Sequence, residues 1–232
     1  MRDPQHVKGL KEYGPFDELL TDHGSLTFMY QPFYIGENFR ITPPGYPLST
    51  DGRTNLVMQR GAFGSGEHET TESCLKVLEY LPGIKGANVL DLGSGTGILA
   101  IAALKLGAAH VVCVDIEPKA VVTAQVNARL NDLDDRVTHI TGTLDAVTAR
   151  DFDLILANIY GDILLELADS LTARLKPEGR LLLSGILWEY NFDVRQAYEK
   201  RGCRVVRNHM LDEFSTIVMQ KGGPDGPPLS TS

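Results

Sequence analysis

The 232-residue sequence predicts an α/β protein built on an open, mostly parallel sheet that ends in an antiparallel strand. Strand-like and helix-like patterns alternate from Asn88 to Arg201, as is typical of parallel sheets with right-handed crossovers. The last two strand patterns are separated only by Leu211 and Asp212. Because two residues cannot carry a parallel crossover, these strands must pair as a hairpin.

The individual elements follow from apolar periodicity and from the turn residues between them. Strands are expected to begin at Asn88 and to cover residues 110–116, 136–141, 152–157, 180–184, 203–210 and 213–219. Helices are expected at residues 98–104, from Pro118 onward, at residues 161–175 and at residues 189–201. An earlier helix ends at Pro82-Gly83 and carries on one face Thr71, Cys74, Leu75, Leu78 and Leu81.

The N-terminal region is punctuated by prolines and has only short apolar segments. We expect strands at residues 26–30, 33–35 and 39–42, one or two helical turns at residues 15–20, and a polar turn at residues 50–55. This predicts a small β-rich appendage, residues 1–60, packed on a main domain, residues 61–221. The Gly/Pro/Ser-rich tail, residues 222–232, is expected to be disordered.

Composition excludes several classes of protein. The hydrophobic share of 43% and the charged share of 22% are those of an ordinary globular protein. The net charge of −8 argues against stable nucleic-acid binding through a basic surface. The three cysteines show no C-x-x-C spacing and are expected to be buried thiols in a reducing cytosol. No signal peptide or membrane span is visible, so we expect a cytoplasmic protein without membrane association and make no prediction of its oligomeric state.

A glycine-rich loop joins the strand at Asn88 to the helix at residues 98–104. Gly93, Gly95 and Gly97 read G-x-G-x-G, whereas a dinucleotide fingerprint needs glycine or alanine at the position of Ile98. Free N–H groups at the start of the helix suit an anionic group of a ligand, such as the carboxylate of a methionine moiety. The preceding acid, Asp91, suits a cationic amine. Together these features favour S-adenosylmethionine over NAD.

Further ligand contacts are expected at the ends of neighbouring strands. Asp115 ends the second strand, 22 residues after Gly93, where an acid accepts hydrogen bonds from a ribose diol; the alternative is a helix cap before Pro118. Asp91 either recognises the methionine amine or satisfies N–H groups of the loop, and the two roles are compatible. Leu144, with its two chain neighbours, is expected beside the adenine.

Asn158 follows the fourth strand, at the crevice where doubly wound sheets bind ligands. Its amide oxygen can accept a hydrogen bond from a substrate amine. Methyl transfer to nitrogen needs a neutral, oriented amine rather than a strong general base. We therefore predict a catalytic role for Asn158, against the alternative of a strand-end turn residue.

Other candidate residues carry less specific signals. His68 has no second histidine at metal-ligand spacing, so we expect no metal site and a structural role. Thr70 and Thr71 either cap the following helix or contact the cofactor. Trp188 lines the substrate entrance or belongs to the core.

These motifs resemble the PrmA family, methyltransferases that modify a ribosomal large-subunit protein. The resemblance rests on residues 62–71 (Ala-Phe-Gly-Ser-Gly-Glu-His-Glu-Thr-Thr), residues 89–109 and Ala157-Asn158-Ile159, with support from residues 183–187. It implies a Rossmann-like methyltransferase fold whose mostly parallel seven-stranded sheet has an antiparallel last strand. It also implies an aromatic lid from Phe63, amine methylation near Asn158, and cofactor contacts from Thr71, Gly93, Asp115 and Asn158.

The expected function is therefore S-adenosylmethionine-dependent N-methylation of lysine or N-terminal amines of a protein, with a ribosomal protein as one candidate. The alternatives are a small-molecule methyltransferase, a non-catalytic cofactor-binding module and a misread NAD enzyme. The sequence departs from the family at two points, and the second bears on the substrate. Glu69 stands where the family commonly has proline, and only about thirty residues precede the matching region in place of a substrate-recognition domain.

Overall fold

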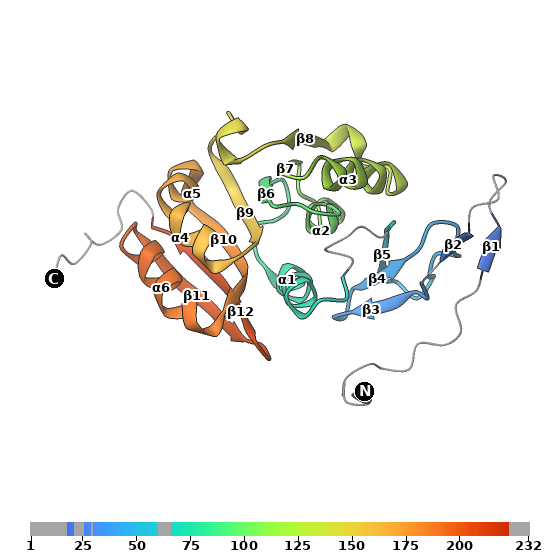
Figure 1. The fold of residues 1–232 in the computed structure, drawn as a ribbon, viewed down its shortest axis with the longest axis horizontal. Helices are drawn as coiled ribbons and strands as arrows, with labels where there is room; N and C mark the ends of the chain where they lie inside the picture. Colours follow the sequence, from blue (N-terminus) through green and yellow to red (C-terminus); the bar gives the residue numbers. More distant parts are fainter. Residues whose placement is uncertain (1–17, 21–25, 29, 60–65, 223–232) are drawn as a thin grey trace, which may run out of the picture.

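The computed structural model describes residues 18–20, 26–28, 30–59 and 66–222. Phe63 and the tail from residue 223 lie outside these ranges, so the lid and the disordered tail stay predictions. The main element is a seven-stranded sheet with strand order β11-β12-β10-β9-β6-β7-β8 (Figure 1). Its strands are β6 (Asn88–Leu92), β7 (His110–Asp115), β8 (Val137–Thr141), β9 (Phe152–Asn158), β10 (Leu175–Leu187), β11 (Cys203–Met210) and β12 (Phe214–Lys221).

The predicted reversal at the end of the sheet is confirmed. β12 lies between β10 and β11 and runs antiparallel to both, whereas β6, β7, β8, β9 and β10 pair in parallel. β6 and β9 are neighbours, and the chain connections switch from one side of the sheet to the other between these two strands. Such a switch point opens a crevice at the carboxyl ends of the strands.

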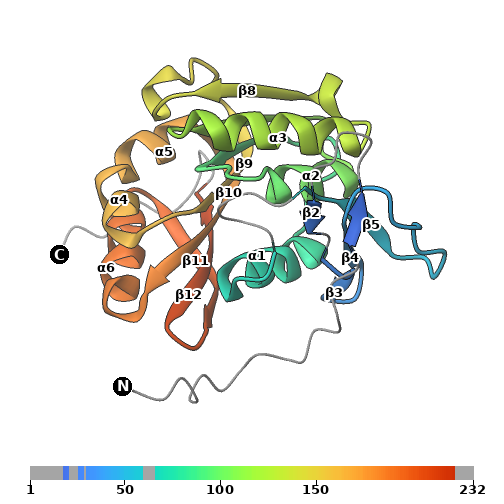
Figure 2. The same cartoon turned by 45° about the vertical axis from the view of Figure 1, so that its right-hand side comes forward.

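Helices cover both faces of the sheet. They are α1 (Glu69–Tyr80), α2 (Ile98–Lys105), α3 (Pro118–Leu130), α4 (Gly161–Glu166), α5 (Ala168–Arg174) and α6 (Trp188–Glu199), with 3₁₀ turns at Asp134–Arg136 and Leu144–Ala146. α1 and α2 pack on one face and α4, α5 and α6 on the other, and α3 lies beside α2 (Figures 1 and 2). Successive strand residues point to opposite faces of the sheet. Val89 therefore packs in the hydrophobic core with α1 and α2, whereas Leu90 packs in the core on the other face with α4, α5 and α6.

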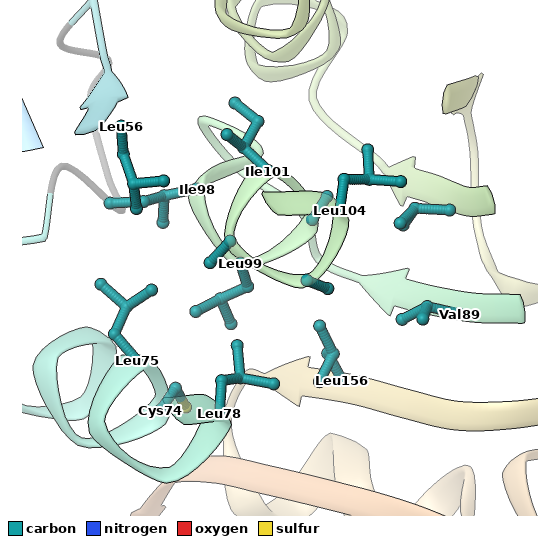
Figure 3. Close-up of a cluster of buried hydrophobic side chains, with 14 of the residues drawn as sticks. Leu56, Cys74, Leu75, Leu78, Val89, Ile98, Leu99, Ile101, Leu104 and Leu156 are labelled. Carbon is teal, nitrogen blue, oxygen red and sulfur yellow. The ribbon is translucent and has the colours of Figure 1, made fainter. Parts of the chain in front are cut away.

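A small N-terminal sheet packs against α1 and α2, as predicted for the β-rich appendage. It contains β3 (Phe33–Ile35), β4 (Phe39–Thr42) and β5 (Thr54–Val57), with β3 antiparallel and β5 parallel to β4. Its apolar residues share one core with the two helices. Figure 3 shows Leu56 beside Ile98, with Leu75 and Leu99 below them.

Two N-terminal predictions are wrong. Glu18–Leu20 is a strand, β1, rather than a helical turn, because it pairs with β2 (Leu26–Phe28). Thr54 and Asn55 belong to β5 rather than to a polar turn, because their backbone pairs with Phe39 and Arg40. In both cases a partner distant in sequence determines the local conformation.

The predicted helix at residues 161–175 is divided in two. Leu167 leaves helical geometry between α4 and α5, and Leu175 already belongs to β10. The predicted breaker at residues 176–179 lies inside β10 as an irregularity, since the register with β9 shifts between Leu175 and Arg180. Glu178 takes a φ of 61° there.

The three cysteines are buried and free, as predicted. Burial raises the pKa of the Cys74 thiol to about 12, so this group is an inert part of the core. Within the described ranges, no helix combines the length and the apolar character that a membrane crossing requires.

Candidate functional site

The glycine loop lies at the carboxyl end of β6, against the end of β9. Gly93 has a φ of +69°, and a Cβ there would stand 2.5 Å from Cγ2 of Ile159. Only glycine therefore allows the loop to approach the segment that follows Asn158. Gly97 precedes the first residue of α2, again with a positive φ, so the backbone N–H groups of this helix start face the same edge of the sheet.

Asp115 is tied to the glycine loop rather than to a helix. Its Oδ2 accepts a hydrogen bond from the Gly95 N–H at 2.8 Å, and its Oδ1 accepts one from the Glu117 N–H at 2.9 Å. The cap of α3 is Glu117, whose side chain accepts from the Lys119 N–H. The helix-cap alternative for Asp115 is therefore wrong, and its carboxylate is fixed beside the loop.

Asp91 is a buried acid beneath the loop. Its side chain is almost fully buried and accepts a hydrogen bond from the Ala100 N–H at 3.2 Å. This donor belongs to the first turn of α2 rather than to the loop, where the sequence predicted the N–H partners of Asp91. Burial, and secondarily the charge of Asp115, raise the pKa of Asp91 to about 7. No cationic side chain among the described residues pairs with it, so a positively charged ligand group would stabilise its ionised form.

Asn158 and Thr71 are hydrogen-bonded to each other, although 87 positions separate them in the sequence. Asn158 Nδ2 donates to Thr71 Oγ1 at 3.3 Å, and Thr71 lies in the first turn of α1. No donor to Asn158 Oδ1 is found within the described part of the chain. The contact orients the amide so that its oxygen is available to an incoming N–H group.

Gly185 supports Asn158 from the neighbouring strand, a role that our sequence reasoning missed. It has a φ of +77°, and a Cβ there would lie 2.6 Å from the Ile159 carbonyl oxygen and 3.2 Å from Asn158 Oδ1. The register between β10 and β12 shifts at this position, between Leu183 and Ile186. An isolated glycine inside a strand pattern is the signal that could have revealed it.

The start of α1 has a structural role, as expected for His68. The His68 ring accepts from the Thr70 N–H as the helix cap and packs edge-on against Phe214. Glu69 accepts hydrogen bonds from the N–H groups of Asp212 and Glu213, at 3.0 and 3.3 Å. Glu69, which stands where the family commonly has proline, therefore joins α1 to the turn between β11 and β12. The sequence did not predict this contact.

Two asparagines hold the chain that leads out of β5: Asn127 of α3, and Asn131, which caps the C-terminal end of that helix. Asn131 accepts from the Val57 N–H and donates to the Val57 carbonyl, and Asn127 makes the same pair of bonds with Gln59. Asn127 also donates to the Thr96 carbonyl at 2.9 Å. One buried side chain thus connects the glycine loop to the N-terminal sheet. The i, i+4 spacing of the two asparagines was the only sequence signal.

The two remaining candidate residues differ in burial: Trp188 is exposed and Leu144 is buried. Trp188 is 53% exposed and its Nε1–H donates to the Phe214 carbonyl, so the core alternative for this residue is wrong. Leu144 is buried in the core, and Arg174 donates to its carbonyl oxygen. Any contact of Leu144 with a ligand would therefore come from its backbone.

Comparison with known proteins shows the family to which the chain belongs. Residues 25–222 match the family described as "Ribosomal protein L11 methyltransferase (PrmA)". Proteins named ribosomal protein L11 methyltransferase from Trichlorobacter lovleyi and Pelobacter propionicus are 41% and 44% identical, over 73% and 83% of this chain. The chain spans 58% and 64% of the length of these two relatives.

Solved structures agree with this assignment. The crystal structure of a ribosomal protein L11 methylase from Lactobacillus delbrueckii subsp. bulgaricus is 29% identical, with a TM-score of 0.74, and covers 84% of this chain and 99% of that one. A putative RNA methyltransferase from Pyrococcus horikoshii, 19% identical with a TM-score of 0.57, shares the fold alone. The chain belongs to the PrmA family of methyltransferases.

Proposed function

We propose that this chain transfers a methyl group from S-adenosylmethionine to an amine of a protein, with ribosomal protein L11 as the first candidate substrate. The observation that carries the proposal is the contact between Asn158 and Thr71 beside the glycine loop. It presents an amide oxygen at the edge of the sheet where Asp91, Asp115 and the start of α2 converge. We assign the chemistry to residues 61–221, with residues 1–60 as a supporting unit.

The donor groups of the crevice fit the cofactor. Asp115 would hold the ribose hydroxyls, and the backbone of Gly93, Gly95 and Gly97 would accommodate the methionine moiety. Asp91 would favour the cationic amine, directly or through water, because its buried carboxyl has no cationic partner among the described residues. Thr71 and the backbone of Leu144 complete the proposed contacts.

The acceptor amine must reach the site neutral and oriented. S-adenosylmethionine, when bound, supplies an electrophilic methyl group on a sulfonium centre. A free lysine amine, with a pKa of about 10.4, is protonated at neutral pH, so the entrance must favour its loss of a proton to water. Asn158 Oδ1 then accepts a hydrogen bond from the neutral amine, which aims the nitrogen lone pair at the methyl carbon. No strong base is needed at this position.

The relatives' names support L11 as the substrate, and the net charge of −8 favours a basic protein over a nucleic acid. The test is incubation of the protein with labelled S-adenosylmethionine and, in separate reactions, purified L11, free lysine and ribosomal RNA. We expect label in L11, located on amines by mass spectrometry. Label only in free lysine would favour the small-molecule alternative. Cofactor binding without any product would favour a binding module.

A further inference from the structure

Large apolar side chains are exposed around the start of α4 and α6, next to Asn158. We call this set the aromatic rim. It consists of Tyr160, Ile163, Leu187, Trp188 and Phe192. Monomeric proteins rarely gather apolar side chains in one exposed region without an interaction to account for them.

The segments that carry the rim are held together by contacts in the fold. Asn158 pairs with Ser184 across β9 and β10, and the Ile159 N–H donates to the Ser184 carbonyl. A Cβ on Gly161 would stand 2.8 Å from Cβ of Tyr190, so the first turns of α4 and α6 touch. Figure 2 shows these two helices side by side. The two helix starts that carry the rim are therefore packed next to the segment that presents Asn158.

Trp188 is fixed in its exposed position. Its indole N–H donates to the Phe214 carbonyl at 3.1 Å, and its backbone N–H donates to the Glu213 carbonyl at 3.3 Å. A tryptophan held in this way loses little conformational freedom when it is covered, which is why such residues dominate binding energies at interfaces.

The charge around the rim is mostly negative; the exception is Arg195, whose guanidinium carbon lies 5.8 Å from the centre of the Phe192 ring. Residues 158–173, 184–194 and 211–214 contain no lysine or arginine. They carry exposed acids at both helix starts and at the hairpin turn, namely Asp162, Glu189, Asp193, Asp212 and Glu213. None of these five acids forms a salt bridge with a described residue. With five exposed acids against this one arginine, the rim offers apolar contact in a mostly negative surrounding, which attracts cationic polypeptide and repels phosphate.

We propose that the aromatic rim docks a cationic segment of the substrate protein that also carries an apolar side chain, and that this docking brings the acceptor amine to Asn158. This inference rests on the proposed function and specifies the chemistry of its substrate. The apolar side chain covers Trp188 and Phe192. Lysine or arginine residues of the same segment face the surrounding acids.

The test compares variants in steady-state methylation of purified L11, with binding of S-adenosylhomocysteine measured in parallel. Trp188→Ala and Phe192→Ala should each raise the KM for L11 by roughly tenfold, with cofactor binding unchanged. The matched control is Val122→Ala, since Val122 and Phe192 are both 58% exposed on helices and Val122 lies on α3. Glu189→Gln combined with Asp193→Asn should raise KM roughly threefold or more at low salt and have little effect at high salt. Its control is Asp134→Asn with Asp135→Asn, which changes the net charge equally.

The outcomes distinguish this inference from the function on which it rests. If the wild type methylates L11 and the rim variants keep the KM of Val122→Ala, the docking surface is wrong and the proposed function stands. If the wild type binds S-adenosylhomocysteine but methylates no polypeptide, both are wrong. A loss of cofactor binding in Trp188→Ala and Phe192→Ala alike, in proportion to the loss of activity, would also overturn the docking role.

Discussion

Asp115 is held at the end of β7 by two backbone N–H groups, one of which belongs to the glycine loop. Its position and charge suit a ribose diol. Asp115→Ala should therefore weaken binding of S-adenosylhomocysteine by about 1–3 kcal/mol, because a hydrogen bond to a charged group is lost. Isothermal titration calorimetry measures this directly. Asp134→Ala, at an exposed site away from the crevice, should bind like the wild type, and unchanged affinity in a folded Asp115→Ala protein would exclude the ribose role.

Asp91 predicts a pH dependence. Its pKa is raised from 3.8 to about 7 in the free protein, chiefly by burial, and a cationic ligand prefers the carboxylate form. Affinity for S-adenosylhomocysteine should therefore rise between about pH 6 and about pH 8 and then level off. Asp91→Asn should bind more weakly and lose this dependence. Identical pH profiles of the wild type and Asp91→Asn would contradict the proposed contact.

The raised pKa of Asp91 also makes the stability of the folded protein depend on pH. Stability should fall as the pH rises, whereas ligand affinity should increase. An acid whose pKa is raised by folding contributes stability that is fully present below its unfolded pKa, here 3.8, and is lost as the pH rises through about 7. The Tm of the unliganded wild type, relative to that of Asp91→Asn, should fall over this range. Ligand binding should restore part of the loss.

At the scale of elements, α3 couples the N-terminal sheet to the glycine loop. Asn127 and Asn131 are both buried. Asn131 bonds the N–H and C=O of Val57 in β5, and Asn127 bonds those of Gln59 just after β5. Only Asn127 also donates to the Thr96 carbonyl. Asp has the same shape as Asn but cannot donate a hydrogen bond. Asn127→Asp should therefore weaken S-adenosylhomocysteine binding several-fold more than Asn131→Asp.

Measurement of Tm and cofactor affinity for both variants separates positioning of the loop from general stability. Both substitutions remove a donor to the strand, so both should lower Tm. If the two variants lose cofactor affinity in the same proportion, the contact with Thr96 has no special role. The comparison also tests whether the N-terminal sheet supports the site through this side chain.

Much of the element order could be predicted because it depends on local periodicity. The alternating apolar pattern located every strand of the large sheet, and the two-residue connection at Leu211-Asp212 required the antiparallel strand. Errors arose where a distant partner decides the conformation, as at Thr54 in β5. The division between α4 and α5 was missed because the leucines at residues 164, 171 and 175 keep helical spacing across the break.

In the candidate site, positions at strand ends were predictable and cross-chain contacts were not. Asp115 and Asn158 follow strands, so their place at the ligand edge follows from topology. Their partners depend on tertiary packing: Thr71 comes from a helix that precedes the sheet, and Gly185 approaches Asn158 from the next strand. The hydrogen bonds from Glu69 to the hairpin turn have no sequence pattern that could have announced them.

At the scale of the whole molecule, methyl transfer requires the residues around the glycine loop to hold the cofactor while Asn158 orients the acceptor amine. The most direct measurement is the turnover of L11 methylation by Asn158→Ala, with S-adenosylhomocysteine affinity determined on the same protein. Turnover should fall roughly 10- to 100-fold, because the amine loses its orientation, while affinity changes little. Asn88→Ala, at an exposed strand start, should behave like the wild type. Unchanged turnover, or a loss of affinity that accounts for the whole loss of activity, would contradict the catalytic role of Asn158.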